Sequence, residues 1–356
     1  MPGRKRYTPS RRGNISIFRR LTRWLLVGLL AGVLLIGSGL FWLNHQANQP
    51  VHSGAQTIEL VVPYGTSARG VASHLRESGV QIHEGLFLIQ ARWLGVQRQL
   101  QAGVYQVESG ITKKQLIRRL AGVDDSVTAL RIIEGWTVRQ AIDAAEKNAD
   151  LKFDLPTYRS PRELANIIGA PEMHPEGWLY PDLYVVKKNS SVTDVLRRAV
   201  GHQQRILARE WDKRTPGLPY ATMQEALIVA SIVEKETQFP GDRERVAAVF
   251  ANRLRLGMPL QADPTVIYGL GDRFKGDITK AHLRTDTPYN TYTRKRLPPT
   301  PISNPGVRAL RAVMAPAQTK ALYFVAKGDG SSEFSETLEE HNSAVNRFIR
   351  RLKEKI

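Results

Sequence analysis

The sequence predicts an α+β protein with a single N-terminal transmembrane helix, a small βα module and a larger mixed α/β domain. Three observations predict it: one long apolar run near the N-terminus, a strand–turn–helix pattern that occurs three times, and amphipathic helices separated by irregular loops. The 356 residues are 42% hydrophobic and 24% charged, which suits a chain with more than one folded domain. The chain has no cysteine, which excludes disulfides, Cys-ligated metal centres and thiol nucleophiles.

The first predicted element is the apolar helix over residues 24–43. Its twenty residues, WLLVGLLAGVLLIGSGLFWL, carry no charge and are enough for an α-helix to cross about 30 Å of hydrocarbon. The tail before it, residues 1–23, has eight Arg or Lys and no acid, so the positive-inside rule places the N-terminus in the cytoplasm and exports the rest. The alternatives are a cleaved signal peptide, whose apolar core would be shorter, and a twin-arginine signal at Arg19-Arg20.

The net charge of +18 does not by itself predict a nucleic-acid surface. Eight positive charges lie in the tail, and the remaining 43 basic and 33 acidic residues leave +10 for the rest of the chain. No basic run there is interleaved with aromatic residues, so we expect no nucleic-acid partner. An anionic membrane surface or cell-wall polymer is the simpler partner, and we expect no cofactor and no metal.

Three strand–turn–helix units follow a polar linker over residues 44–56. Each turn places Gly two residues before a Thr or Ser that can cap the next helix, in Gly65-Thr66-Ser67, Gly110-Ile111-Thr112 and Gly135-Trp136-Thr137. We expect the first two units to form a small module over 57–125 and the third to open the larger domain, 126–356. Such a repeated βα unit resembles the LysM modules that bind cell-wall glycans, and the alternative is a scaffold with no ligand of its own.

Residues 150–220 are predicted to be rich in loops. The densest part is PEGWLYPDLY at 175–184, where three aromatic residues accompany two prolines. Trp178, Tyr180 and Tyr184 could form a wall for stacking sugars, but a packed turn is the favoured interpretation.

The segment EALIVASIVEKETQFP, residues 225–240, is a nearly apolar helix that carries two glutamates where it ends. Thr222 is its expected N-cap. Counting back from Glu236 by three, four and seven residues reaches only valine and isoleucine, so the periodicity favours Glu236 rather than Glu234 as the buried glutamate. A buried Glu tends to keep its proton near neutral pH, whereas two solvated glutamates at a helix end remain the alternative.

A second amphipathic helix, DRERVAAVFANRLRLG, follows, and after it come two irregular loops at 260–271 and 287–306. Loops carried on packed helices are where substrate contacts usually lie. Asp263 precedes Pro264 and could either contact a substrate or cap a helix. We interpret His341, at the start of the last helix, as structural.

Six motifs in this order resemble the endolytic murein transglycosylase family, also called MltG or YceG-like. They are EGWLYPDLY, ASIVEKET, FANRLRLGMPLQADPTVIYG, YNTY, LPPTPISNPG and LYFVAKGDGSSEFSETLEEHN. The resemblance runs from about residue 57 to the C-terminus. It implies a bacterial inner-membrane protein with a cytoplasmic N-terminus and a periplasmic catalytic part at 126–356.

The resemblance also implies the chemistry. The family cuts peptidoglycan glycan strands internally, between N-acetylmuramic acid and N-acetylglucosamine, and leaves 1,6-anhydro ends, which would terminate nascent strands. Its catalytic acid corresponds to Glu236, and substrate contact or support of that acid is expected from five residues: Gln261, Asp263, Tyr289, Asn290 and Tyr292. Peptidoglycan synthases (penicillin-binding proteins) are the expected protein partners. Two alternatives remain: a hydrolytic muramidase, in which Asp263 would be a second acid, and a peptidoglycan-binding scaffold without catalysis.

Overall fold

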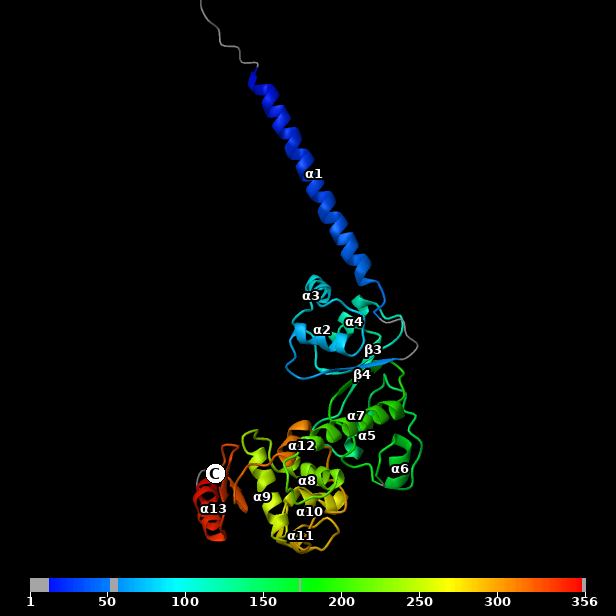
Figure 1. Cartoon of the computed structure of the whole chain (residues 1–356). Helices are drawn as coiled ribbons and strands as arrows, with labels where there is room; N and C mark the ends of the chain where they lie inside the picture. Colours follow the sequence, from blue (N-terminus) through cyan, green and yellow to red (C-terminus); the bar gives the residue numbers. More distant parts are fainter. Residues whose placement is uncertain (1–12, 52–56, 173, 354–356) are drawn as a thin grey trace, which may run out of the picture. The chain divides into compact units, whose positions relative to one another are not determined.

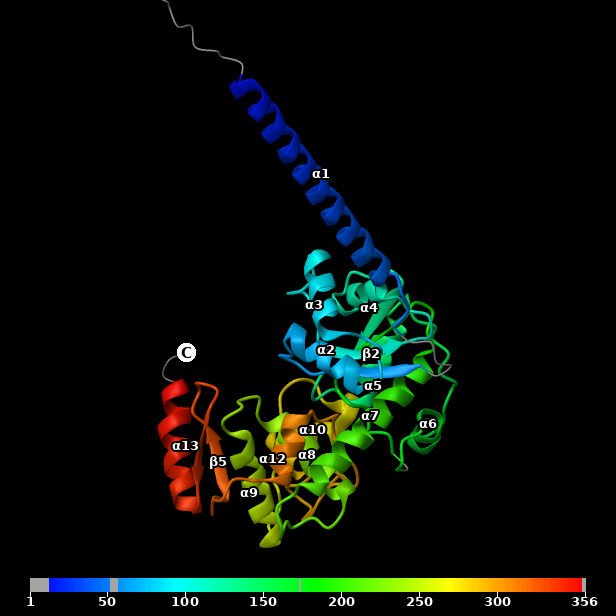
Figure 2. The same ribbon diagram turned by 45° about the horizontal axis from the view of Figure 1, so that its top comes forward.

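The computed structural model describes residues 13–51, 57–172 and 174–353, and its helices and strands are shown in Figures 1 and 2. The chain divides into two compact units, residues 1–124 and 125–356. The expected α+β class is confirmed, with one apolar N-terminal helix followed by mixed helices and antiparallel strands.

The N-terminal apolar helix, α1 (Gly13–Ala47), is longer than the predicted run. Its segment Thr22–Ala47 is long and apolar enough to span a membrane. The chain that follows docks directly onto the unit, because Ala47 and Val51 are fully buried and the Val51 amide donates to the Ile111 carbonyl at 2.9 Å. The expected linker over 44–56 is therefore wrong for residues 44–51, and residues 52–56 lie outside the described part.

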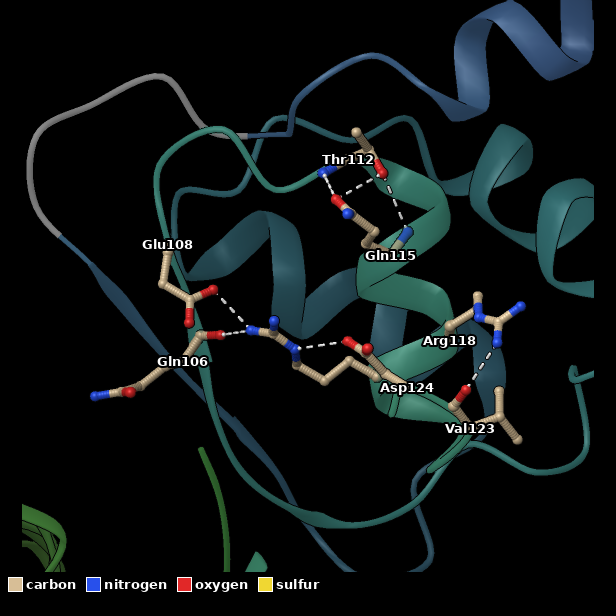
Figure 3. A network of polar contacts seen from close by, with 8 residues as sticks. Gln106, Glu108, Thr112, Gln115, Arg118, Val123 and Asp124 are labelled. Carbon is tan, nitrogen blue, oxygen red and sulfur yellow. Dashed lines mark hydrogen bonds and ion pairs between the residues drawn. The ribbon is translucent and has the colours of Figure 1, made fainter. Parts of the chain in front are cut away.

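Unit 1 is built from two antiparallel strands and three short helices. The strands β1 (Ile58–Val62) and β2 (Gly103–Val107) pair in the register Leu60 to Tyr105. The helices are α2 (Ala68–Glu77), α3 (Glu84–Trp93) and α4 (Lys113–Leu120). Thr112 caps α4 in a capping box with Gln115, as the repeated turn pattern predicts (Figure 3). The nearly buried Arg119 binds Glu108 at 2.7 Å and Asp124 at 3.3 Å, two residues labelled in Figure 3, and so links β2 to the end of the unit.

Unit 2 begins with the third strand–turn–helix pattern, β3 (Val127–Arg131) and α5 (Val138–Glu146). The prediction of mainly loops over 150–220 is wrong. This part contains α6 (Pro161–Ile168), β4 (Leu183–Lys187), which pairs antiparallel with β3, and the 21-residue α7 (Val192–Asp212). The apolar face of α7 is hard to see in the sequence because charged and amide side chains dominate its composition, although Ser191 caps it in the usual way.

The core of unit 2 is a helical layer in which α8 (Met223–Glu236), α9 (Arg243–Arg255) and α12 (Val307–Met314) pack on one another (Figure 1). Beside α8 lies α10 (Asp263–Leu270), and the 3₁₀ turn η1 (Gly271–Arg273) and α11 (Lys280–Arg284) contact α10. The hairpin of β5 (Tyr323–Ala326) and β6 (Ser332–Ser335) packs on α13 (Leu338–Lys353), as Figure 2 shows.

Buried side-chain hydrogen bonds join three distant parts of the sequence behind α8. The Asn304 side chain is fully buried, accepts from the Leu179 amide at 3.0 Å and donates to the Trp136 carbonyl at 2.9 Å. Ser231, in the middle of α8, accepts from the Ile302 amide at 3.0 Å. Trp178 and Tyr184 are buried, which confirms the packed-turn interpretation of that segment.

Candidate active site

The site is built around the C-terminal end of α8. Thr222 accepts from the Glu225 amide at 3.1 Å and starts the helix, and residues 226–234 are all buried. The helix ends at Glu236 because Thr237 adopts an extended backbone. Glu236 is half-buried, and its carboxyl has no hydrogen-bond partner among the residues that the structure describes.

Glu234 has a different environment, because its carboxylate is bound by neighbouring groups. Glu234 is only 7% exposed, less than Glu236. Its carboxylate accepts from the Gly306 amide at 2.8 Å and from Arg243 Nη2 at 3.3 Å. The counting rule missed it because Glu234 faces the loop at 302–306 rather than an apolar neighbour. Glu234 is thus a fully engaged structural residue, whereas Glu236 is left available.

Two segments next to this helix end are hydrogen-bonded to each other. The prediction of an irregular loop over 260–271 is wrong for residues 263–270, which form α10, whereas residues 260–262 lead into that helix. The Gln261 amide donates to the Thr291 carbonyl at 3.1 Å, and the Ala262 amide donates to Thr291 Oγ1 at 3.0 Å. Tyr292 Oη donates to Asp263 Oδ1 at 2.5 Å. Tyr292, from the motif YNTY, is thereby brought next to Gln261 and Asp263, which lie together in the motif FANRLRLGMPLQADPTVIYG.

The charges around Glu236 favour its protonated form. Burial raises the pKa of Glu236 to about 8, with the nearby Asp263 also raising it and Arg253 opposing them. Burial also raises the pKa of Tyr292, together with its hydrogen bond to Asp263, so its hydroxyl stays a donor at neutral pH. The arrangement holds one removable proton on Glu236 beside a second acid that is already hydrogen-bonded.

The other two predicted residues hold the loops in place in this conformation. Asn290 is fully buried, and its amide nitrogen donates to the Leu283 and Thr285 carbonyls at 3.0 and 2.7 Å, while its oxygen accepts from the Tyr292 amide at 2.8 Å. Tyr289 Oη is 2.8 Å from Thr300 Oγ1. Asp263 is the first residue of α10, whose N-cap is Ala262, so Asp263 does not act as the cap.

Arg253 is a residue of the site that the sequence analysis missed. Its side chain is nearly buried and donates to the carbonyls of Leu322, Pro259 and Leu260 at 2.7, 3.1 and 2.9 Å, and to Gln261 Oε1 at 3.0 Å. It makes no ion pair among the described residues, so its charge acts on the site. Arg253 follows Phe250 by three residues and Val249 by four. The rule that singled out Glu236 would therefore have found it too.

A second missed group lies behind Tyr289. Burial raises the pKa of Glu176 to about 7, although the Val138 amide and Tyr268 Oη donate to its carboxylate at 2.9 and 3.0 Å. The Tyr268 ring packs against the Tyr289 ring with centroids 4.8 Å apart. Glu176 lies in a turn, where no periodicity could have revealed its burial. Among the described residues, no group of three or more His, Asp or Glu side chains could hold a metal ion.

Comparison with known proteins identifies the family. The sequence model of the YceG-like family matches residues 60–347. The chain belongs to the YceG-like family. That match includes both loops, the end of α8 and Arg253.

Three similar proteins carry names that agree with this family. An endolytic murein transglycosylase of Bacillus subtilis is 30% identical over 340 residues, covering 90% of this chain and 93% of that protein. One from Streptococcus pneumoniae is 25% identical, covering 81% of this chain and 58% of that protein. The crystal structure of a yceG-like protein of Listeria monocytogenes is similar with a TM-score of 0.50 and 29% identity, covering 82% of this chain and 99% of that one. The predicted enzyme class, a peptidoglycan lyase, is the class of the Bacillus subtilis and Streptococcus pneumoniae relatives, which are named endolytic murein transglycosylases.

Proposed function

We propose that this chain is an endolytic lytic transglycosylase in which Glu236 is the only proton-transfer residue. The observation that carries the proposal is the contrast at the end of α8, where Glu234 is fully engaged and Glu236 is half-buried, unbonded within the described residues and has a pKa of about 8. A carboxylic acid that is protonated at neutral pH can donate to a leaving oxygen, and the names of the relatives point to the glycosidic bond of murein.

The proposed reaction uses the Glu236 carboxyl group twice, first as an acid and then as a base. Glu236 donates its proton to the oxygen of the bond between N-acetylmuramic acid and N-acetylglucosamine, and that bond breaks to leave an oxocarbenium-like sugar. The resulting carboxylate then takes the proton of the muramic acid C6 hydroxyl as that oxygen bonds to C1. The product carries a 1,6-anhydro ring, no water is consumed, and Glu236 is protonated again for the next cycle.

The neighbouring residues have defined tasks in this proposal. Asp263, oriented by Tyr292, places negative charge where the positive sugar forms and keeps Glu236 protonated beforehand. Arg253 stabilises Glu236 once it has lost its proton, and it fixes the Gln261 side chain. Gln261 and Tyr289 are proposed to contact the glycan, and Asn290 to support Tyr292.

The rest of the chain gives the proposed enzyme its location. α1 would anchor it in the bacterial inner membrane with residues 1–23 in the cytoplasm and the enzyme in the periplasm. Residues 57–125, the LysM-like module, would bind glycan, and residues 126–356 would be the catalytic domain. Near the penicillin-binding synthases, such an enzyme would terminate nascent strands.

The test is mass spectrometry of purified glycan strands after digestion by the full chain in detergent. We expect anhydro-ended fragments from internal cuts with the wild type, and a loss of about 10²–10⁴-fold in rate with Glu236→Gln. Glu234→Gln is the matched control, two residues away. It should lower the free energy of unfolding, since it weakens a buried ion pair, while its folded fraction still cleaves.

Three other results would each favour a different function or a different catalytic residue. Reducing ends would mean that water attacks C1, which would make the protein a muramidase with Asp263 as the second acid. Cleavage at the wild-type rate by Glu236→Gln would exclude Glu236 as the acid. Binding of strands without any cleavage by the wild type would favour the scaffold alternative.

A further inference from the structure

The join between α1 and unit 1 contains almost no free chain. The apolar run ends at Leu43, and Ala47, four residues later, is already buried in the unit, which is about 6 Å along a helix. Lys113 fixes this end, because its ammonium donates to Gln46 Oε1 at 3.2 Å and its amide donates to the Gln49 carbonyl at 3.1 Å. The polar headgroup layer on each side of a bilayer is roughly 5–8 Å deep. If α1 spans the membrane, this face of unit 1 therefore lies at the headgroups.

Helix α3 lies on the same face. α1 and α3 both pack on α4. A hollow between α3 and α4, close to the end of α1, is lined by Val51, by Leu86 and Phe87 of α3, and by Lys113 and Leu116 of α4. Figures 1 and 2 both show α3 on the side of unit 1 where α1 joins it.

The outer side of α3 exposes two large apolar side chains that do not contribute to the core of the unit. Phe87 and Ala91 face the interior of the unit and are buried, whereas Ile89 and Trp93 are 50% and 45% exposed. An exposed Trp on a short apolar helix is typical of a membrane interface, where the ring sits among the headgroups.

The exposed basic residues of α3 and of the turn after it are unpaired. Arg92 of α3 and Arg98, five residues beyond the end of this helix, are exposed and have no ion pair within the described part of the chain, whereas the only acid of α3, Glu84, is bound to Arg76 at 2.8 Å. Residues 57–124 as a whole hold eight Arg or Lys and five Asp or Glu. Positive side chains at a membrane surface attract anionic lipids, each by about 1 kcal/mol.

We propose that the outer face of α3, formed by Ile89, Arg92 and Trp93, lies in the headgroup layer of the membrane that α1 crosses, with anionic lipid phosphates bound by Arg92 and Arg98. The proposal rests on the membrane anchor of the proposed function. Unit 1 is then held at two points, which prevents it from turning freely about the axis of α1.

The absence of cysteine allows a direct test by spin labelling of the full chain in vesicles of phosphatidylethanolamine and phosphatidylglycerol. Single cysteines are placed by Ile89→Cys on α3, by Leu34→Cys in the middle of α1, and by Tyr64→Cys as the control. Tyr64 is 99% exposed and lies in the turn between β1 and α2. Collision of each label with oxygen, which concentrates in lipid, is compared with collision with a water-soluble nickel chelate.

We expect the oxygen-to-nickel ratio to be highest at 34, and at 89 to exceed that at 64 several-fold. Equal ratios at 89 and 64 with a high ratio at 34 would overturn the proposal for α3 and leave the anchor intact. A low ratio at 34 would overturn the anchor, and this proposal with it.

Combining Arg92→Gln with Arg98→Gln should lower the oxygen-to-nickel ratio at position 89 in these vesicles but not in vesicles of phosphatidylcholine alone. An equal ratio with and without the two arginines would overturn the role of anionic lipid.

Discussion

At the scale of single residues, the site depends on the proton of Glu236. Its pKa of about 8 predicts that kcat/KM for glycan cleavage is constant from about pH 6 to 7 and falls tenfold per pH unit above about pH 8, because the acid is then ionised. The profile is measured on glycan strands with the wild type and with Arg253→Met. Since Arg253 opposes the rise in the pKa of Glu236, its removal should move the fall to higher pH. A fall already complete below pH 6 in the wild type would contradict the assignment.

The same proton makes stability depend on pH. Between the ordinary pKa of 4.5 and about 8, the folded state holds a proton on Glu236 that the unfolded state has released. The contribution of Glu236 to the free energy of unfolding therefore falls as pH rises across this window, by at most about 1.4 kcal/mol per pH unit. Glu236→Gln should be more stable than the wild type at pH 8, with the difference shrinking towards pH 5.

Urea unfolding of both proteins at pH 5, 6.5 and 8 measures this difference. Glu176, whose pKa is also raised by burial, is present in both proteins, so its effect cancels in the comparison. A difference that does not change with pH would show that Glu236 is solvated and ordinary.

The site residues were predictable from sequence only where they follow a helical period or a known motif. Glu236 stands out as an acid on an apolar face, and Arg253 would have stood out by the same rule. Glu234 did not, because its partner, the Gly306 amide, lies 72 residues away and leaves no local pattern. The burial of Asn290 likewise depends on the carbonyls of α11, which its own loop does not reveal.

At the scale of elements, the loops behind α8 are held by close backbone packing. Gly177 has φ +84°, and a Cβ there would lie 2.6 Å from the Cβ of Pro301. We expect Gly177→Ala to lower the free energy of unfolding by about 1–2 kcal/mol for the backbone conformation and by about 1–3 kcal/mol more for the clash. Cleavage should fall as well, because Pro301 adjoins the segment bound to Ser231 of α8.

Gly169→Ala is the matched control for this prediction. Gly169 has φ +74°, but nothing lies within 4 Å of the point where its Cβ would be, so only the first cost applies. Denaturant unfolding of the two variants separates the two costs. Equal losses of stability would mean that Pro301 moves away without cost.

Elements with strong local signals were predicted well. The three turns with Gly before a capping Thr or Ser do start α2, α4 and α5. α3 was missed because it is apolar on both sides and His83 before it makes no capping bond, and α7 was missed because its polar face dominates its composition. Pairing of β3 with β4 joins residues more than fifty positions apart and could not be read locally.

At the scale of the whole molecule, the short join between α1 and unit 1 should be visible in proteolysis. Val51→Ser removes a buried side chain that contributes about 1.5 kcal/mol or more, so local opening of residues 44–51 should become about tenfold more frequent. Cleavage there by a protease of broad specificity, applied to the full chain in detergent, should accelerate by the same factor. Asn48→Ser, at an exposed position of the same segment, is the control; it removes only exposed hydrogen bonds from Asn48 Nδ2 to Asn44, including that to the Asn44 carbonyl at 2.8 Å, and should accelerate cleavage far less than Val51→Ser. Fast cleavage of the wild type would contradict the docking.

The hydrogen bonds of Arg253 determine when the site can be completed during synthesis of the chain. One guanidinium joins α9, the loop at 259–261 and the carbonyl of Leu322, so the loop that carries Gln261 and leads into α10 is completed by a segment about sixty residues further along the chain. During synthesis, α8 and its glutamate leave the ribosome long before that partner does. An exported chain would therefore have an unfinished site until Leu322 has also emerged and folded, so the site is completed later than the helix that carries its glutamate.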